Sequence, residues 1–318
     1  MIEQRAVPGS NLAVSSIGLG TAALGTAYGP PETERPPPSP HAAIETIRAA
    51  LDAGVTLIDT APDYGEAESL VGEATDASAC VVATKLPVPG SGWADLPEDE
   101  IRRFVRTSVE TSLRRLRREE IDILQIHNAD RGLVEKGTLT AAMREVRDEG
   151  LVSVLGATVY SEDDALAVVE DDAFGTVQIA YSALDRRAER AILPRAAETG
   201  TAVFARSVLL RGVLSEAGRS LGGRYQPLQT AADRVRRALG AEWADLSAAA
   251  LAFVLVQPGI TAAIVGLRDR SELDVLLDAR ARFTKRAAQA AAELDHLPDD
   301  LLDPRTWPHA SPTDERRR

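Results

Sequence analysis

Three apolar segments of the chain, residues 56–59, 80–85 and 121–127, each end in a residue that can carry charge or move a proton: Asp59, Lys85 and His127. Tyr64 follows the first of these by five residues. Each residue alone has an ordinary explanation, such as a helix cap, a partly buried ring, a solvated lysine or a satisfied core histidine. These separate explanations account poorly for a titratable residue at the end of three successive apolar segments. The pattern predicts one site with four titratable groups.

These four residue types suit hydride transfer to a carbonyl carbon. The transfer leaves negative charge on the carbonyl oxygen, which needs a proton donor and a second hydrogen bond. A tyrosine hydroxyl titrates near about pH 10 and donates reluctantly, but a neighbouring ammonium lowers its pKa and a carboxylate keeps that ammonium charged. Tyr64, Lys85 and Asp59 supply these three groups, and histidine supplies the second donor. The same groups serve the reverse oxidation of an alcohol.

The elements that must position these residues follow from the hydrophobic pattern. Short apolar and β-branched segments, which we expect to be strands, alternate with segments of helical period. The expected strands are 16–20, 56–59, 80–85, 121–127, 152–159, 176–180, 202–207 and 261–265. The expected helices include 41–53, 99–116, 138–149, 191–199 and 247–256. The alternation predicts one α/β domain folded as a (β/α)8 TIM barrel, whose C-terminal strand ends form the catalytic face.

The composition fits an enzyme that acts on a small molecule. The chain has 318 residues, 44% hydrophobic residues and a formal net charge of −12, which is typical of a globular protein and disfavours nonspecific nucleic-acid binding. The single cysteine, Cys80, excludes internal disulfides and thiolate zinc sites, and no metal site is predicted. No apolar run is long enough to span a membrane, and no signal peptide is evident. We therefore expect a cytoplasmic protein without a membrane or nucleic-acid partner.

Two segments depart from the repeat of strands and helices. Residues 30–40 contain six prolines, which predicts a surface loop on the catalytic face after the first strand. Residues 298–318 contain four prolines and end in three arginines, which predicts a flexible C-terminal extension. The barrel domain is therefore assigned to residues 1–297. A Gly-x-Gly-x-x-Ala motif at 18–23 is not read as a Rossmann phosphate loop, because glycines and prolines follow where that motif requires a long helix.

The segments 54–68, 83–85 and 124–127 resemble the aldo-keto reductases, NAD(P)-dependent (β/α)8 barrels that reduce aldehydes and ketones. The resemblance extends from about residue 16 to residue 277. It implies that Tyr64 is the general acid, that Lys85 lowers the pKa of the Tyr64 phenol, that Asp59 pairs with Lys85, and that His127 orients the carbonyl. The implied function is an NAD(P)H-dependent oxidoreductase that interconverts a small carbonyl compound and an alcohol.

Further segments resemble the cofactor-binding parts of this family. Residues 156–161 match its Gly-Val-Ser-Asn-Phe-Ser segment, although Val159 replaces an asparagine that helps to hold the nicotinamide carboxamide. Residues 205–212 and 264–268 are similar to segments beside the pyrophosphate and the adenosine. By resemblance, Tyr181 stacks on the nicotinamide ring. The implied cofactor contacts are Thr158, Gln178, Tyr181, Ser207, Leu209, Gly212, Gly266 and Arg268.

NADP is the expected cofactor, with NAD as the alternative. A 2′-phosphate needs a cation near the adenosine ribose, and Arg268 is the candidate, although Asp269 and Glu272 make the local charge mixed. Two other functions stay open. A strand-end lysine such as Lys85 can form a Schiff base in a barrel lyase, and the chain can also be a non-catalytic partner subunit that senses the cofactor. The sequence leaves the carbonyl substrate, the physiological direction and the oligomeric state undetermined.

Overall fold

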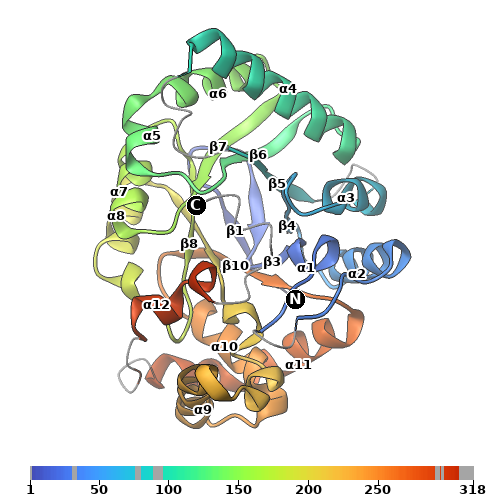
Figure 1. Ribbon diagram of the computed structural model, residues 1–318, viewed down its shortest axis with the longest axis vertical. Helices are drawn as coiled ribbons and strands as arrows, with labels where there is room; N and C mark the ends of the chain where they lie inside the picture. Colours follow the sequence, from blue (N-terminus) through green and yellow to red (C-terminus); the bar gives the residue numbers. More distant parts are fainter. Residues whose placement is uncertain are drawn as a thin grey trace.

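The computed structural model describes residues 2–30, 34–75, 80–88, 96–290, 294 and 297–307. Its centre is a closed barrel in which eight parallel strands follow the order β10-β3-β4-β5-β6-β7-β8-β9 (Figure 1). The barrel strands are β3 (Ile17–Gly20), β4 (Leu57–Asp59), β5 (Val81–Leu86), β6 (Ile121–Ile126), β7 (Val152–Thr158), β8 (Thr176–Ala180), β9 (Ala202–Arg206) and β10 (Ile260–Gly266). The predicted (β/α)8 barrel is confirmed. Each strand begins and ends within one residue of its expected bounds.

The helices surround this barrel as an outer ring (Figure 1). They are α1 (Ala22–Gly25), α2 (Pro40–Asp52), α3 (Ala67–Thr75), α4 (Glu98–Leu116), α5 (Arg131–Lys136), α6 (Thr138–Asp148), α7 (Glu162–Glu170), α8 (Ile192–Thr199), α9 (Gln226–Leu239), α10 (Leu246–Leu255), α11 (Arg270–Ala290) and α12 (Asp299–Leu302). The five helices expected from periodicity correspond to α2, α4, α6, α8 and α10. Of the described helices, none is by itself long and apolar enough to cross a membrane; a pair bent by 89°, Gly223–Leu239 with Trp243–Leu255, meets those criteria jointly.

The alternation of side chains along the strands produces two separate cores. Inward-facing residues, among them Leu57, Ala83, Ile123 and Phe204, fill the barrel interior, and the outward-facing residues pack against the helices. The hairpin of β1 (Gln4–Ala6) and β2 (Ala13–Ser15), which periodicity did not indicate, contributes Val14 to the interior cluster. This alternation decides which side chains at the strand ends face the barrel axis.

The proline-rich loop follows β3, as expected. Its described part pairs Tyr28 with Arg35 through two backbone hydrogen bonds of 3.1 Å. Ser39 then caps α2 by accepting a hydrogen bond from the backbone of Ala42, and Pro40 occupies the first turn, where its missing N–H has no consequence. Residues 31–33 of this loop lie outside the described residues.

The C-terminal segment 298–307 packs against the barrel domain. Helix α12 is followed by a short 3-10 turn, and the side chains of Leu302 and Trp307 are buried. Trp307 packs edge-on against Tyr225 with ring centroids 6.5 Å apart. The prolines limit helix length here, and buried apolar side chains attach residues 298–307 to the rest of the domain. Residues 308–318 lie outside the described residues.

Candidate active site

A buried ion pair between β4 and β5 forms the base of the site. Asp59 and Lys85 lie two residues beyond Leu57 and Ala83, which face the barrel interior, so both side chains face the barrel axis at its C-terminal end. The Lys85 ammonium donates to Asp59 Oδ2 at 2.9 Å and to the Thr60 carbonyl at 2.7 Å. The two residues are only 1% and 4% exposed. This is the pairing that the sequence predicted.

The second oxygen of Asp59 is held by two buried amides. Gln178 on β8 donates from Nε2 to Asp59 Oδ1 at 2.8 Å, and Gln125 on β6 donates to the same oxygen at 3.4 Å. The carboxylate therefore has partners on both oxygens. A buried charge without such partners would be strongly unfavourable.

Two glycines position Tyr64. The loop 60–65 passes so close to α1 that a Cβ on Gly25 would lie 1.8 Å from the Tyr64 carbonyl oxygen. Gly65 has a φ of +58°, and a Cβ there would lie 2.4 Å from the Gly25 carbonyl oxygen. Only glycine fits both positions without displacing the backbone. The result is a tight loop that carries the tyrosine toward Lys85, whose Nζ lies 4.9 Å from the ring centroid.

The pKa values of Tyr64 and Lys85 depend on each other. Burial raises the pKa of Tyr64 above its ordinary value, and the Lys85 ammonium opposes that rise. Burial lowers the pKa of Lys85, but Asp59 and Tyr64 outweigh it, so the pKa of Lys85 is raised. Lys85 therefore stays an ammonium at neutral pH. Lys85 thus acts on the pKa of Tyr64 in the predicted direction, but the net shift is upward because desolvation is the larger effect.

His127 lies beside the tyrosine at the end of β6. The two rings are nearly perpendicular, with centroids 6.1 Å apart. Nδ1 of His127 lies 3.3 Å from Oδ2 of Asp63, the residue before Tyr64. The four predicted catalytic residues are thus brought together, and Asp63 joins them.

The predicted nicotinamide contacts on β7 and β8 divide into two groups. Thr158 is buried at the mouth of the barrel, where its hydroxyl accepts a hydrogen bond of 2.8 Å from the Asn128 backbone. Gln178 also faces the axis and contacts Asp59. Tyr181 does not: its side chain is 0% exposed, stacks on Phe253 of α10 at 6.5 Å, and donates to Glu189. The predicted stacking role of Tyr181 is therefore wrong for this arrangement, because three residues after Gln178 a side chain faces the helices.

The loop after β9 has an unusual backbone. Ser207, Leu210 and Arg211 have φ values of +58°, +43° and +53° although none of them is glycine. Such conformations are costly, and they concentrate at functional sites. Gly212 has a φ of +91°, and a Cβ on it would lie 3.1 Å from Pro30 of the proline-rich loop. Leu209 is half-buried in the same loop.

The strand-eight segment places Arg268 against the proline-rich loop. Its guanidinium donates to the carbonyls of Arg35 and Pro36. Asp269 caps α11 by accepting a hydrogen bond of 3.0 Å from the Glu272 backbone, and the helix begins at Arg270. Gly266 is exposed, and a Cβ on it would meet nothing closer than 3.8 Å.

This donor set fits a nicotinamide dinucleotide. Amide and hydroxyl groups of Gln178 and Thr158 lie at the barrel mouth, the serine and backbone of 207–212 follow on the next strand, and the Arg268 guanidinium lies beyond β10. Phosphates are bound by backbone N–H groups and guanidinium forks, and barrels commonly hold them after their seventh and eighth strands. The residues present can therefore hold this cofactor.

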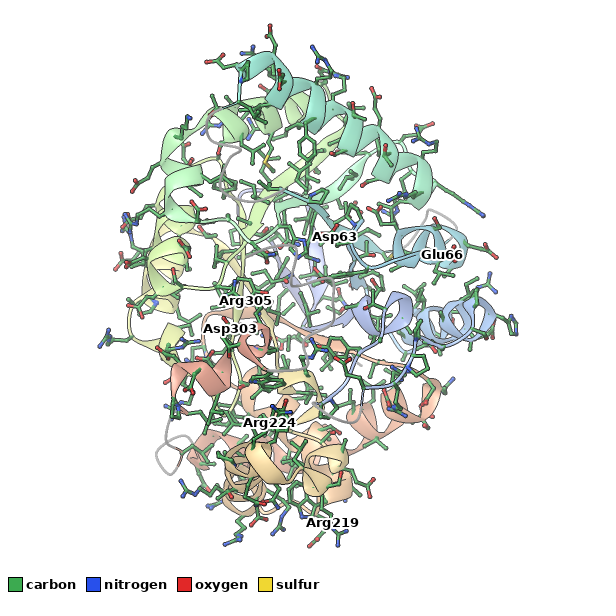
Figure 2. All side chains as sticks on the ribbon, in the orientation of Figure 1. Asp63, Glu66, Arg219, Arg224, Asp303 and Arg305 are labelled. Carbon is green, nitrogen blue, oxygen red and sulfur yellow. The ribbon has the colours of Figure 1, made fainter. Side chains whose placement is uncertain are left out.

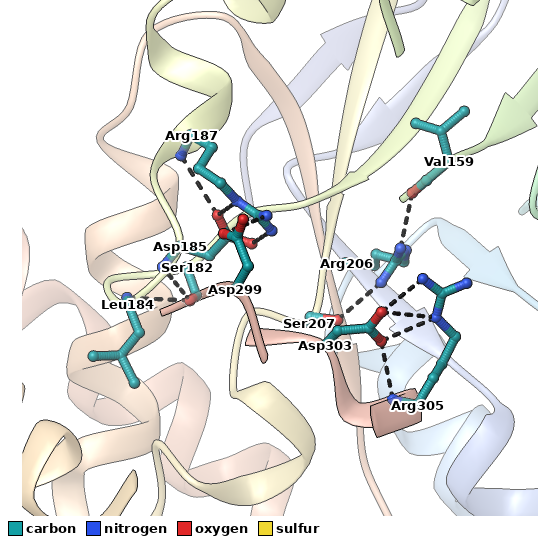
Figure 3. Close-up of polar contacts among 10 residues, drawn as sticks. All are labelled: Val159, Ser182, Leu184, Asp185, Arg187, Arg206, Ser207, Asp299, Asp303 and Arg305. Atoms are coloured by element: carbon teal, nitrogen blue, oxygen red, sulfur yellow. Dashed lines mark hydrogen bonds and ion pairs between the residues drawn. The ribbon is translucent and has the colours of Figure 1, made fainter. Parts of the chain in front are cut away.

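Three residues of the site were not predicted from the sequence. Asp63 is a loop residue with no signal beyond its position next to Tyr64. The inward orientation of Gln125 and Arg206 could have been predicted from the alternation along the strands. They lie two residues beyond Ile123 and Phe204, which face the barrel interior. Arg206 ends β9 and donates to the Val159 carbonyl at 2.8 Å and to the Ser207 hydroxyl at 3.2 Å (Figure 3).

Comparisons with known proteins agree with this geometry. The sequence model of the aldo/keto reductase family matches residues 16–296. The chain is 32% identical over 223 residues to the aldo-keto reductase YhdN of Bacillus subtilis (strain 168), a match that covers 67% of this chain and 64% of that protein. It is 26% identical over 287 residues to the L-galactose dehydrogenase of Arabidopsis thaliana, covering 86% of each.

Solved structures with the same fold include the glycerol dehydrogenase AKR11B4 from Gluconobacter oxydans. It is similar with a TM-score of 0.70 and 25% identity over 95% of this chain and 98% of that one. The holo form of the aldo-keto reductase AKR11C1 from Bacillus halodurans gives a TM-score of 0.72 at 22% identity, covering 91% and 96% of the two chains. The second likeness concerns the fold alone.

Proposed function

The chain belongs to the aldo/keto reductase family of NAD(P)-dependent carbonyl oxidoreductases, and we propose that Tyr64, Lys85, Asp59 and His127 carry out its proton chemistry. The single observation that supports this assignment is the position of the Lys85 ammonium, 2.9 Å from Asp59 and 4.9 Å from the centre of the Tyr64 ring. Substrates are small carbonyl compounds or alcohols. We propose a cytoplasmic location, as the sequence predicts.

The residues act on the substrate oxygen. When bound, the nicotinamide supplies or accepts a hydride. Tyr64 gives its hydroxyl proton to the oxygen that becomes negative during reduction, and it takes the proton back during oxidation. Lys85 stabilises the phenolate that remains, Asp59 keeps Lys85 protonated and in place, and His127 donates a hydrogen bond that orients the carbonyl. The surrounding barrel keeps water away from the buried ion pair.

The raised pKa of Lys85 argues against the Schiff-base lyase. A nucleophilic lysine must be unprotonated, whereas burial here is outweighed by Asp59 and Tyr64, so the ammonium is favoured. Borohydride with a carbonyl compound would trap an adduct at Lys85 if the lyase reaction occurred. We expect no adduct in the intact-mass spectrum.

We further propose NADP as the preferred cofactor, with Arg268 at its 2′-phosphate. Thr158 and Gln178 would hold the carboxamide, and Ser207, Leu209, Gly212 and Gly266 would lie along the pyrophosphate and adenosine. Arg268 currently donates to two backbone carbonyls, which are weak partners for a guanidinium compared with a phosphate.

Tyr64→Phe tests the proposed chemistry. The variant keeps the ring but has no proton to donate, so turnover should fall by about 10²- to 10⁴-fold, the usual contribution of a general acid. The NADPH dissociation constant, measured by fluorescence, should change little. Full activity of Tyr64→Phe across a panel of aldehydes and ketones would refute the assignment. Cofactor binding without oxidation by any carbonyl in wild type would instead favour the cofactor-sensing subunit.

A further inference from the structure

A second carboxylate is buried close to the catalytic pair, but on the helix side of the barrel wall. Glu68 is the second residue of α3 and is 1% exposed. Its Oε1 accepts a hydrogen bond of 2.7 Å from the Thr84 hydroxyl, and its Oε2 accepts one of 3.2 Å from Arg115 of α4, whose side chain is 43% exposed. Burying a charged group has a free-energy cost. The proton chemistry of Tyr64 and Lys85 makes no direct use of this charge.

Thr84 connects this carboxylate to the strand that carries Lys85. Ala83 packs inside the barrel, so alternation along β5 directs Thr84 toward the helices and Lys85 toward the barrel axis. The Thr84 side chain is 0% exposed, and its hydrogen bond to Glu68 joins β5 to the first turn of α3. Thr84 and Lys85 are adjacent in the chain, so a displacement of Thr84 displaces the backbone of Lys85 as well.

The same turn of α3 ends the loop that carries Tyr64. The Ala67 backbone donates to the Tyr64 carbonyl at 3.1 Å, and Glu68 is the next residue. In Figure 2, Asp63 lies over the barrel and Glu66 lies at α3, so the chain runs outward from the barrel to the helix between them. The position of Glu68 therefore limits where the backbone of Tyr64 can lie.

The start of the Tyr64 loop is attached to β5 as well. The Thr60 backbone donates to the Ala83 carbonyl at 2.8 Å, and the Thr60 carbonyl accepts from Lys85 at 2.7 Å. Backbone contacts thus fix the loop to β5 before Tyr64, and the side chain of Glu68 fixes it to β5 after Tyr64. Substitution of a side chain can remove the second attachment while the first stays in place.

Helix α3 is itself held closely against α4. Gly72 lies one turn after Glu68, and a Cβ on Gly72 would lie 2.3 Å from the Arg115 carbonyl oxygen. The backbones of the two helices therefore touch at this point, and the Arg115 guanidinium contacts Glu68 Oε2. With α3 fixed in this way, the Glu68 carboxylate is a defined acceptor for the Thr84 hydroxyl.

We propose that Glu68 is a positioning residue, which through Thr84 sets the distance between the Tyr64 ring and the Lys85 ammonium. This inference rests on the proposed function of Tyr64 and Lys85. The Lys85 Nζ lies 4.9 Å from the Tyr64 ring centroid, and the influence of an ammonium on a phenol weakens as they separate. A reacting group displaced by about 1 Å can lose about 10²-fold in rate.

The test separates positioning from stability. Thr84→Val removes the hydroxyl and leaves Glu68 Oε1 without its donor, whereas Thr84→Ser keeps the hydroxyl. The double variant Thr84→Val with Glu68→Met replaces both buried partners by apolar groups of similar size, which is nearly neutral for stability. Thr261→Val is the control. It removes a hydroxyl that accepts a hydrogen bond of 3.1 Å from the Val203 backbone, at the N-terminal end of β10 and away from the catalytic face.

The assay uses a carbonyl compound that wild type reduces, together with its alcohol. We expect Thr84→Val and the double variant to lose about ten- to a hundredfold in kcat, with KM and the NADPH dissociation constant within about twofold. The rise of the oxidation rate with pH should move to higher pH by about half a unit or more, because a more distant Lys85 lowers the pKa of Tyr64 less.

Stability should follow a different order. The urea midpoint should fall in Thr84→Val and return toward the wild-type value in the double variant, although kcat stays low there. Thr84→Ser should restore wild-type kcat and the wild-type pH profile. Thr261→Val should lower the urea midpoint without changing either of them. If Thr84→Val does not fold, the double variant decides the question.

Three results would overturn the proposal. They are wild-type kcat in the double variant, a lower kcat there with an unshifted pH profile, and an equal loss of kcat in Thr261→Val. The second result would show that the separation of Tyr64 and Lys85 is unchanged. Tyr64→Phe is assayed with the same substrates: its full activity would refute the proposed function, whereas these three results concern an enzyme that still requires Tyr64.

Discussion

Gln178 on β8 donates a hydrogen bond of 2.8 Å to Oδ1 of Asp59 on β4, across the interior of the barrel. The other carboxylate oxygen, Oδ2, accepts a hydrogen bond from Lys85 at 2.9 Å. One side chain that the sequence assigned to the cofactor therefore also supports the catalytic ion pair. Asp59 connects the part of the site that handles protons to the part proposed to hold the nicotinamide.

We expect Gln178→Leu to lower the free energy of unfolding by about 1.5–3 kcal/mol, because it removes a hydrogen bond to a buried charged group. Gln125→Leu is the matched control. Its hydrogen bond to the same oxygen is longer, at 3.4 Å, so its loss should matter less. Urea denaturation of both variants measures the difference. An equal loss of stability in both variants, or a larger loss in Gln125→Leu, would contradict the stronger contribution assigned to Gln178.

The pH dependence of the two reaction directions should reflect the raised pKa of Tyr64. Carbonyl reduction needs the protonated hydroxyl, so its rate should stay level from neutral pH and fall only as the pH rises through that pKa. Alcohol oxidation needs the phenolate, so its rate should rise by about tenfold per pH unit below that pKa. Profiles of kcat/KM between about pH 6 and 11 measure both limbs.

Removing the Lys85 charge should move the pH dependence of both reaction directions to higher pH, since the ammonium acts to lower the pKa of Tyr64. Lys85→Met alone leaves the Asp59 charge buried and unpaired, at a cost of about 3–5 kcal/mol. The double variant Lys85→Met with Asp59→Asn avoids this loss. The Asp59 charge raises the pKa of Tyr64 and is the smaller of the two effects, so the shift to higher pH should persist in the double variant. An oxidation rate whose pH dependence stays in place or moves to lower pH there would show that Lys85 does not outweigh Asp59 in tuning Tyr64.

Most of the barrel could be predicted from the sequence because each strand is a short apolar run between helical segments. The hairpin of Gln4–Ala6 and Ala13–Ser15 could not, since its strands have three residues each and too little alternation to detect. The C-terminal segment was judged by its prolines, whereas burial of Leu302 and Trp307 decides its packing. Tertiary contacts of this kind have no local signal.

Asp59, Lys85 and His127 could be predicted as one group because each lies at the C-terminal end of a strand, and parallel strands end on one face of a barrel. Tyr64 follows the first of these strands in a short loop. Whether a side chain faces the barrel axis or the helices depends on its spacing from a strand residue of known orientation. Tyr181 is three residues past Gln178, and this odd spacing directs it to the helices, whereas Arg206 is two residues past Phe204 and faces the axis. The contact between Asp63 and His127 depends on a loop conformation that periodicity does not describe.

Gly25→Ala should displace Tyr64. The added Cβ would lie 1.8 Å from the Tyr64 carbonyl oxygen, which is backbone and has little freedom to move. We expect a loss of about 1–3 kcal/mol in the free energy of unfolding and a lower kcat, since overpacking moves the backbone. Gly222→Ala is the control, because no atom lies within 4 Å of its Cβ position. Wild-type kcat in a folded Gly25→Ala protein would show that the tyrosine loop adapts.

Cofactor preference is tested most directly at Arg268. We expect Arg268→Ala to weaken NADPH binding by about ten- to a hundredfold, because a guanidinium contact to a phosphate contributes about 1.5–3 kcal/mol, and to leave NADH binding unchanged. Arg270→Ala is the control. Arg270 is exposed, begins α11 two residues after Arg268, and pairs with Asp274 at 2.8 Å instead of contacting the proline-rich loop. Fluorescence titration of both cofactors on the three proteins gives the constants. An unchanged NADPH constant in Arg268→Ala would refute the assignment of this residue, and tighter binding of NADH than of NADPH by wild type would refute the preference for NADP.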